Sequence, residues 1–230
     1  MARSQILKDV VSGKESIENI LLRLKVILSD LDNELIMKWV DGELQGYKSE
    51  DDLPKYRIFR GSIIGTYLVN YQAKYTNAPV PLEVLLPQEK IDNISIVTVN
   101  DSIATVQNML DGENRERFAK VIPTAFCHAI STSQLQIVGM NVHLSSNHLD
   151  GIVSSVKHKL IEIVMQLEKQ FDNLDELDIK SQVEEDSSKR DQIVYDIENI
   201  IYEGSPISIG DKNKINKSKL GHIFGRKDQV

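Results

Sequence analysis

The sequence contains a single cysteine, Cys127, among its 230 residues. One thiol cannot form a disulfide within the chain, and chains without disulfides are typical of a reducing compartment. Long apolar segments are also missing, because no stretch approaches the roughly 18 uninterrupted apolar residues that a membrane span requires. The first residues, MARSQILKDVVSGKES, lack the apolar core and the small-residue cleavage site of a signal peptide. We therefore expect a cytoplasmic protein that has no membrane partner.

Motifs that carry well-known reaction chemistry are absent as well. The sequence has no glycine-rich phosphate loop, no G-x-S-x-G and no H-E-x-x-H. His148 and His158 are too far apart to share a helix face as i and i+4 ligands, which disfavours a metal site. Cys127 precedes His128 directly, but adjacent helix positions do not face each other, so a nucleophile–base pair is disfavoured. We expect no cofactor, and we assign no catalytic or metal-binding residue.

The charge of the chain is unevenly distributed. The formal net charge is −7, which argues against a general nucleic-acid binder. Residues 211–230 hold six basic and two acidic side chains, a net charge of +4 that leaves −11 for residues 1–210. Such a tail could contact nucleic acid or an acidic partner, or it could be a solvated terminus that binds nothing. The candidate contacts are Lys212, Lys214, Lys217 and Lys219.

Apolar residues recur at helical spacing in three segments. The first covers residues 17–31, and the second begins after Asp32 as a helix cap and ends at Gly46, where a cap with positive φ suits glycine. Because only a few residues separate these two helices, we expect an antiparallel helical hairpin. The strongest pattern covers residues 149–171 and predicts a long amphipathic helix.

Between these helices the composition changes to β-branched and aromatic residues, which are typical of strands. The segments expected to be strands are 56–71, 93–100 and 134–144, the last with an irregularity at Gly139. Residues 115–130 have a helical pattern that Pro123 should interrupt. These patterns predict an α+β fold with a small, mostly antiparallel sheet.

The rest of the chain divides by composition. Residues 172–190 are acidic and poor in aromatics, so they are expected to form a linker or a frayed helix end. Residues 191–204 show the pattern of a short amphipathic helix. Residues 205–230 form an irregular basic tail, whose short strands or hairpins would have too little apolar surface to fold alone. We expect one α+β domain over residues 1–171, followed by these three segments.

The most distinctive stretch is WVDGELQGYKSEDDLPKYR, residues 39–57. Trp39, the only tryptophan, falls on the apolar stripe of the second helix and is expected in the core. Tyr47 follows the helix cap and can fold back on the last turn, and Pro54 should start a strand. Arg57 has two interpretations: a structural ion pair near the acidic residues 50–52, or recognition of a phosphate or carboxylate.

Four segments resemble the AbiTii domain, which is named from an abortive-infection protein of bacterial phage defence. They are LLRLKVILSDLDNELIMKWVDGELQGY, DLPKYR, VNDSIATVQNML and LDGIVSSVKHKLIEIVMQLEKQ, within residues 5–170. The positions that match its most distinctive motif are Trp39, Glu43, Leu44, Gly46, Tyr47, Leu53, Pro54, Tyr56 and Arg57. One departure lies in the long helix, where Lys157 and Lys159 occupy the region of an arginine pair in the family.

The resemblance implies a role in limiting phage infection inside a bacterium. The family has no agreed catalytic residues, so none is transferred to this chain. We therefore expect a non-enzymatic sensor, adaptor or assembly module. Its partners would be other defence proteins, a phage component or a second copy of the chain. The alternatives are a toxin effector such as a nuclease, and a nucleic-acid-binding module that uses the basic tail.

Overall fold

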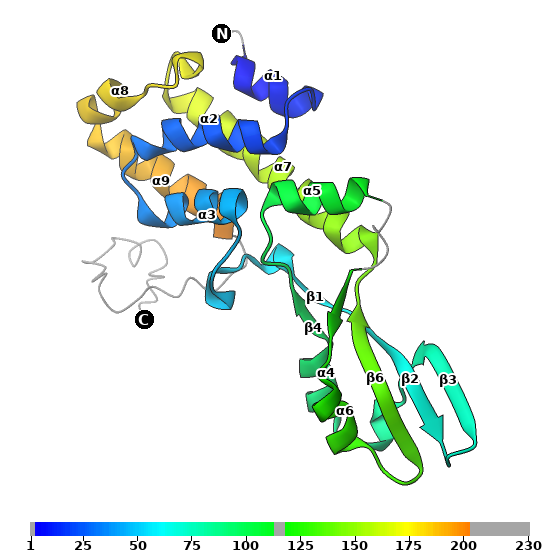
Figure 1. Cartoon of the computed structure of the whole chain (residues 1–230). Coiled ribbons are helices and arrows are strands. Elements are labelled where there is room, and N and C mark those ends of the chain that lie inside the picture. The colour runs from blue at the N-terminus through cyan, green and yellow to red at the C-terminus, as the bar shows by residue number, and fades with distance from the viewer. Residues whose placement is uncertain (1–2, 113–117, 203–230) are drawn as a thin grey trace, which may run out of the picture.

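A computed structural model describes residues 3–112 and 118–202, in which the helices and the sheet occupy different regions (Figure 1). The helical body contains α1 (Gln5–Ser12), α2 (Ile17–Ser29), α3 (Glu34–Gln45), α5 (Ile103–Asp111), α7 (Ser146–Gln170), α8 (Lys180–Glu185) and α9 (Ser187–Tyr202). The sheet lobe contains β2 (Ser62–Val69), β3 (Ala73–Pro79), β5 (Ala119–Val121), β6 (Leu135–His143), α4 (Gln88–Ser95) and α6 (Thr124–Ile130). A separate pair, β1 (Ile58–Arg60) and β4 (Ile96–Thr98), lies at the junction. The short 3-10 turns are η1 (Glu50–Asp52), η2 (Lys55–Arg57), η3 (Leu82–Val84) and η4 (Leu174–Glu176). The predicted α+β class is confirmed.

The predicted N-terminal hairpin consists of α2 and α3, which pack against each other. The side chain of Ser16 caps α2 by accepting a hydrogen bond from the N–H of Asn19 at 3.1 Å. Asn33 caps α3 in the same way, accepting from the N–H of Ile36 at 2.9 Å. Asp32, the predicted cap, instead lies in the connection with a left-handed φ of 49°. Because Asp and Asn suit both a cap and a left-handed turn, the sequence alone does not separate the two roles.

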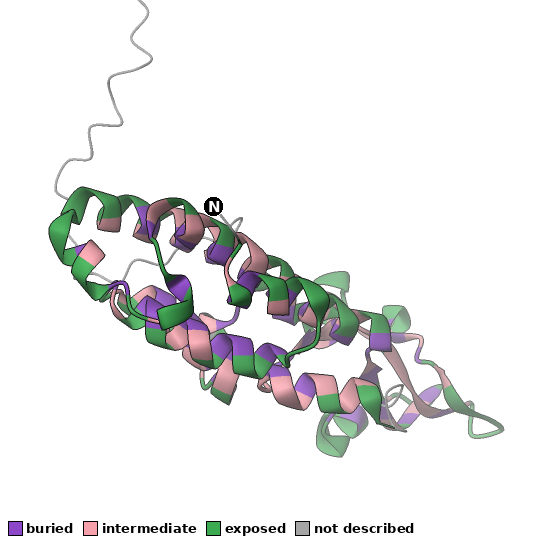
Figure 2. Cartoon of the chain, turned by 90° about the horizontal axis from the view of Figure 1, so that it is seen from above, coloured by how far each residue is buried: buried purple, intermediate pink, exposed green. Residues whose placement is uncertain are grey.

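The predicted long amphipathic helix is α7, which packs against α1, α5 and α9. Its buried stripe consists of Leu149, Ile152, Val156, Leu160, Ile163, Val164 and Leu167. Figure 2 shows that the buried residues of the helices lie on their inward faces. The apolar stripe of α7 therefore serves the core of this chain. Among residues 3–112 and 118–202, every helix is too short or too polar to cross a bilayer.

The start of α1 is tied to the end of α7 by Glu168. Its carboxylate accepts hydrogen bonds from Nη1 of Arg3, from the N–H of Ser4 and from the hydroxyl of Ser4, each at 2.7 Å. Burial raises the pKa of Glu168, but these hydrogen bonds outweigh the burial and hold its pKa below the usual value. α1 has no counterpart among the predicted elements, because its eight residues give too short a periodic pattern.

The four-stranded sheet is antiparallel throughout, in the order β3-β2-β6-β5. One face is closed, since α6 packs against β6. The buried residues of β6 are Leu135, Ile137, Met140 and Val142. Their alternation breaks because the pairing with β2 passes from Ile137 to Gly139 and leaves Val138 as an extra residue. This bulge is the irregularity that the sequence predicts near Gly139.

Two predicted elements differ from the structure, and one strand was not predicted. In the segment 93–100, predicted as a strand, only Ile96–Thr98 is extended, and α4 occupies the residues before it. The segment 115–130, predicted as a helix, contains β5 and then α6, which begins after Pro123. β3 has no predicted counterpart. β5 and β3 lie at the two edges of the sheet, where pairing with β6 and β2 overrides the local preference of the sequence.

The segment 172–190, predicted as a linker, is folded against the helical body. It contains η4, α8 and the start of α9, and it buries Leu174, Ile179 and Val183. Nε of Arg190 also donates to the carbonyl oxygen of Leu31 at 2.9 Å. α9 therefore begins at Ser187 rather than at residue 191, and it packs against α7 and α3.

The predicted division of the chain into domains stays a prediction. The basic tail over residues 205–230, with its expected short strands and its candidate lysines at 212, 214, 217 and 219, lies outside the described residues.

Candidate functional site

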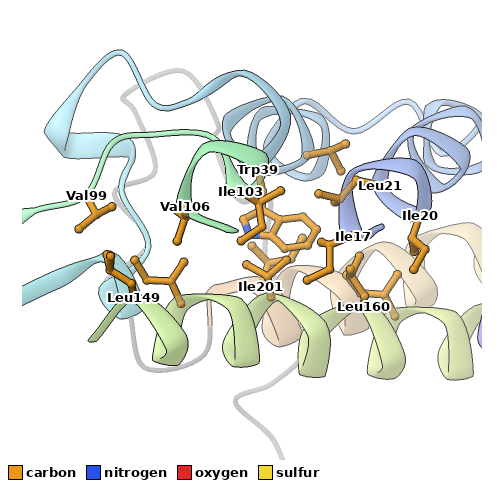
Figure 3. Packing of buried hydrophobic residues seen from close by; sticks show 14 of the residues in the cluster. Ile17, Ile20, Leu21, Trp39, Val99, Ile103, Val106, Leu149, Leu160 and Ile201 are labelled. Carbon is orange, nitrogen blue, oxygen red and sulfur yellow. The ribbon is translucent and has the colours of Figure 1, made fainter. Parts of the chain in front are cut away.

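Residues 39–57, which we call the corner, begin in the middle of the helical body. Trp39 has an exposed fraction of 1%. Figure 3 shows its indole among side chains from other helices, namely Ile17 of α2, Ile103 of α5 and Ile201 of α9. The Nε1–H of Trp39 donates to the hydroxyl of Tyr56 at 2.8 Å. One end of the corner is thus anchored in the core and hydrogen-bonded to the other end.

The backbone of the corner turns at the end of α3. Gly46 has φ 87°, and a Cβ at this position would come within 2.8 Å of the carbonyl oxygen of Asn100, so the turn requires glycine. Tyr47 folds back on the last turn of α3, where a Cβ on Gly42 would lie 2.3 Å from its ring. Pro54 has the extended values φ −61° and ψ 149°, but it leads into η2 before β1 begins. Pro54 therefore starts a turn and not a strand.

Glu43 and Arg57 form an ion pair inside the corner, and both side chains are 0% exposed. Nε of Arg57 donates to Oε1 of Glu43 at 3.0 Å, and Nη2 donates to Oε2 at 2.5 Å. This is the bidentate geometry for which a guanidinium is suited. Nη1 of Arg57 donates to the carbonyl oxygens of Val99 and Asp101 at 3.0 and 2.7 Å. The partner of Arg57 is therefore a helical residue and not the acidic segment 50–52.

Two tyrosines complete this cluster. The hydroxyls of Tyr47 and Tyr56 donate to Oε1 of Glu43 at 2.8 and 2.6 Å. Burial, followed by the charge of Glu43, raises the pKa of both tyrosines far above the usual value, so both stay protonated donors. Burial lowers the pKa of Arg57, but the hydrogen bonds and charge of Glu43 outweigh it and leave the pKa raised. The cluster therefore combines the Glu43–Arg57 ion pair with two neutral tyrosines.

The geometry of the corner favours a structural role. Of the residues predicted from the motif, the structure brings Trp39, Glu43, Tyr47, Tyr56 and Arg57 into one hydrogen-bonded cluster, while Gly46 and Pro54 shape its backbone. The guanidinium has no exposed surface, and all three of its nitrogens donate to protein oxygens. An external phosphate or carboxylate has no access to it in this arrangement.

The two lysines in the region of the family's arginine pair do not converge. Nζ of Lys159 lies 5.7 Å from the centroid of the Tyr56 ring and donates to the carbonyl oxygen of Ile200 near the end of α9. Nζ of Lys157 instead lies near Gly13, the residue that follows α1. A Cβ added to Gly13 would be 3.8 Å from this Nζ. Lys159 thus ties α7 and α9 to the corner, and the two ammonium groups serve different contacts.

Residues 3–112 and 118–202 contain no group of three His, Cys, Asp or Glu side chains that could hold a metal ion. Cys127 is 0% exposed, in the core beside the sheet, whereas His128 is exposed. The two side chains therefore lie in different environments, as expected for adjacent helix positions.

The face of the sheet opposite the buried residues of β6 is hollowed and open to solvent. A shallow hollow of about 460 Å³ is lined by residues of β2, β3, β5 and β6. We call this surface the open sheet face and define it by Ile64, Thr66, Thr76, Asn77, Val121, Val138, Asn141 and His143. Its apolar members are unusually accessible, since Val121 is 74% exposed and Val138 is 49% exposed. Threonine and asparagine supply most of its polar atoms.

The strands that form this face come from stretches almost free of charge. Residues 121–149 contain no Asp, Glu, Lys or Arg, and residues 61–82 contain only Lys74, whereas 27% of the whole chain is charged. Depletion of charge is a compositional feature of the buried centres of protein–protein interfaces. A surface that combines this depletion with exposed valines is a candidate contact surface for another protein.

The hairpin of β2 and β3 projects from the sheet lobe (Figure 1). Asn70 and Tyr71 at its tip have φ 50° and φ 59°, the conformation of a tight hairpin turn. A positive φ costs free energy for a residue with a bulky side chain. The side chain of Tyr71 is 71% exposed, so its contacts within the chain do little to offset that cost. Below the tip, the rings of Tyr75 and Tyr67 stack with centroids 5.0 Å apart. Because Tyr67 pairs with both Tyr75 and Ile137, these two rings lie on the side of the sheet that carries the buried residues of β6 and not on the open sheet face. The exposed Tyr71 at the tip is of a residue type that is enriched in protein contacts.

The AbiTii family model matches residues 3–193. The chain belongs to the AbiTii family. The match covers the corner, the sheet lobe and the start of α9, and residues 205–230 lie beyond it. Membership of AbiTii, an abortive-infection family, indicates a role in antiphage defence. No curated protein and no solved structure matches the chain.

The open sheet face of this AbiTii protein is not among the residues that the sequence predicted as sites. The motif directed attention to the corner, which the structure places inside the protein. The sequence feature that could have indicated the open sheet face is the pair of charge-poor stretches, residues 61–82 and 121–149. These stretches are distant in the sequence, and the pairing of β2 with β6 brings them together.

Proposed function

We propose that this AbiTii protein acts in abortive-infection defence as a non-enzymatic adaptor or assembly module that binds another protein through the open sheet face. The supporting observation is the combination of exposed apolar side chains with charge depletion on one surface. Val121 and Val138 are accessible there, and the surrounding strands supply neutral polar groups. Burying such a surface against a partner removes apolar area from water without desolvating a charge.

The buried corner supports the same function. The motif residues of this AbiTii chain are engaged in holding the fold, and Glu43 accepts three hydrogen bonds at one oxygen. An enzyme would need titratable groups with perturbed pKa values at an accessible site. Here the tyrosines with raised pKa values lie inside the protein, beside a fully paired guanidinium. Their perturbation has a structural cause, namely burial next to a carboxylate.

A pair of matched variants tests the proposal. Val138→Lys places a charge on the open sheet face, and Val26→Lys places the same charge on α2 at a position of similar exposure, 49% against 50%. An unpaired lysine inside an interface is strongly unfavourable, whereas one on a free surface is not. We expect cells that express Val138→Lys to lose protection in a phage plaque assay and cells that express Val26→Lys to keep it. Equal protection by the two variants at equal protein levels would refute the open sheet face as the contact surface.

A further inference from the structure

We infer that the partner of the open sheet face is a second copy of this chain, so that two sheets pack face to face in a dimer. The inference rests on the proposed function, because it names the occupant of the same surface. Two antiparallel sheets that pack in this way lie about 10 Å apart, with side chains from both inner faces interdigitating. Valine, threonine and asparagine side chains of the open sheet face are short enough for that arrangement.

The absence of charge on the open sheet face favours a second copy as its occupant. A basic or an acidic partner would be selected by opposite charges, but the only charged residue in the strands β2, β3 and β6 is Lys74. The surface that complements an uncharged face is another uncharged face. Residues 61–82 and 121–149 supply one on every copy of the chain, and a two-fold axis presents it to itself.

The position of the acidic residues favours the same contact. Residues 172–202 contain ten acidic and three basic side chains, a net charge of −7. They form η4, α8 and α9, which lie at the end of the protein away from the sheet lobe (Figure 1). Repulsion between exposed charges is largely screened beyond a Debye length of about 8 Å at physiological salt. Two copies that meet through their sheet lobes therefore keep their acidic ends beyond that range.

The face of the sheet, and not its edge, is the contact surface. β3 is an edge strand with a row of unpaired backbone groups, but its edge carries the features that prevent strand addition. Lys74 places a charge there, Asn77 has a left-handed φ of 51° at a register shift, and Pro79 lacks an N–H. Lys74 and Asn77 also belong to the open side of the sheet, because Lys74 pairs with Leu68 on the side opposite Tyr67 and Ile137, but both lie along the β3 margin of the face.

The area of the open sheet face determines how strong a dimer we expect. Four strands about 4.8 Å apart and about seven residues long, at about 3.3 Å per residue, cover about 450 Å² on each copy. A stable interface of standard size buries about 800 Å² per partner. We therefore expect a weak dimer that forms in the micromolar range, strengthened where hairpin residues such as Tyr71 add contact area.

Sedimentation equilibrium of the purified full-length chain, from low micromolar to several hundred micromolar, measures the dimer directly. We expect wild type and Val26→Lys to dimerise equally. Val138→Lys and Val138→Glu should each weaken dimerisation at least about tenfold, because each buries an unpaired charge on both copies in an otherwise uncharged contact. Circular dichroism and thermal melts check that the variants are folded, and Val121→Lys replaces Val138→Lys if the latter is not.

Mixing the two charged variants provides the decisive comparison. If the same face meets itself, a lysine face meets a glutamate face in the mixture, and the dimer should reappear with a strength near that of wild type. A monomeric wild-type chain at every concentration would overturn the inference. So would dimers of Val138→Lys as strong as those of wild type, or a mixture that stays monomeric.

The plaque assay separates this inference from the proposed function. If Val138→Lys loses protection while the wild-type chain is monomeric, the open sheet face binds a different protein, and only the inference is wrong. If Val138→Lys loses the dimer but keeps protection, the dimer exists and the proposed function of the face is wrong. Loss of both dimer and protection, with Val26→Lys unchanged in both, is the outcome that we expect.

Discussion

Replacing Arg57 by alanine tests whether the corner holds the fold together. The guanidinium makes two hydrogen bonds to Glu43 and two to the carbonyl oxygens of Val99 and Asp101, and it is 0% exposed. Arg57→Ala therefore leaves a buried carboxylate without its counter-ion and two carbonyl groups without a donor. Tyr47 and Tyr56 still donate to the carboxylate, so part of its hydrogen bonding survives.

The magnitude follows from the loss of one partner of a buried ion pair, which lowers the free energy of unfolding by about 3–5 kcal/mol. The unpaired carbonyl groups would each add about 1–3 kcal/mol, but water that enters the vacated space can bond to them, so we do not add the two effects. A domain of this size is stable by about 5–15 kcal/mol. Arg57→Ala should therefore remain folded in buffer and unfold at a much lower concentration of urea.

The chain offers a matched control and a local probe. Arg60, three residues further on, pairs with Asp92 at 3.2 Å while 65% exposed, so Arg60→Ala should change stability by less than about 1 kcal/mol. Trp39 is the only tryptophan and is hydrogen-bonded to Tyr56, so its fluorescence reports unfolding at the corner. Urea titrations followed by this fluorescence and by circular dichroism give the free energies.

A double-mutant cycle identifies the cause of the loss. Glu43→Gln combined with Arg57→Met should cost less than the sum of the two single changes, because the double variant leaves no unpaired charge in the core. If Arg57→Ala were no more destabilising than Arg60→Ala, or if the two changes at the ion pair were simply additive, the explanation of the corner given above would be wrong.

Three further predictions concern other contacts. Tyr56→Phe removes the hydroxyl that links the indole to the buried carboxylate and should cost about 1–3 kcal/mol in urea titrations, with a shift in tryptophan emission. Gly42→Ala places a methyl group 2.3 Å from a tyrosine ring and should lower the melting temperature, whereas Gly151→Ala, in open space within α7, should raise stability by about 0.5–1 kcal/mol. Glu168→Gln should lose stability at about pH 7, and the loss should shrink as the pH is lowered. A carboxylate with a lowered folded-state pKa stabilises the fold above its unfolded-state pKa and loses this effect as the pH falls through the folded value.

The helices that the sequence predicts are those whose pattern is complete within one segment. α2, α3 and α7 each bury a continuous stripe of apolar side chains. Their helical periodicity can therefore be recognised without knowing which elements they pack against. The edge strands are different. Nearly every residue of β3 is exposed, and all three residues of β5 are exposed, so neither strand shows the alternation that marks a half-buried strand. Their structure depends on pairing with β2 and β6, which lies outside the local sequence.

The ion-pair partner of Arg57 also could not be identified from the local sequence, although the sequence does contain a signal for a buried ion pair. Proximity in the sequence favoured the acidic residues 50–52, but the partner is Glu43 on α3. Glu43 lies four residues after Trp39, on the buried stripe of an amphipathic helix. A charged side chain on such a stripe needs a buried partner of opposite charge, so the pattern of α3 alone predicts an ion pair. Only the fold identifies Arg57 as that partner.

The corner and the open sheet face should fail in different ways, because the corner determines where the sheet lobe leaves the helical body. β1 begins directly after Arg57, and the carbonyl oxygen of Arg57 accepts a hydrogen bond at 3.0 Å from the N–H of Val99, the residue after β4. Arg57→Ala should therefore protect cells against phage at low temperature and lose protection as its lowered melting temperature is approached. Val138→Lys should lose protection at every temperature while its melting temperature stays near that of wild type, because it alters a contact and not the fold. If both variants lost protection in parallel with their melting temperatures, the open sheet face would be one more part of the scaffold, and the contact surface would have to lie elsewhere.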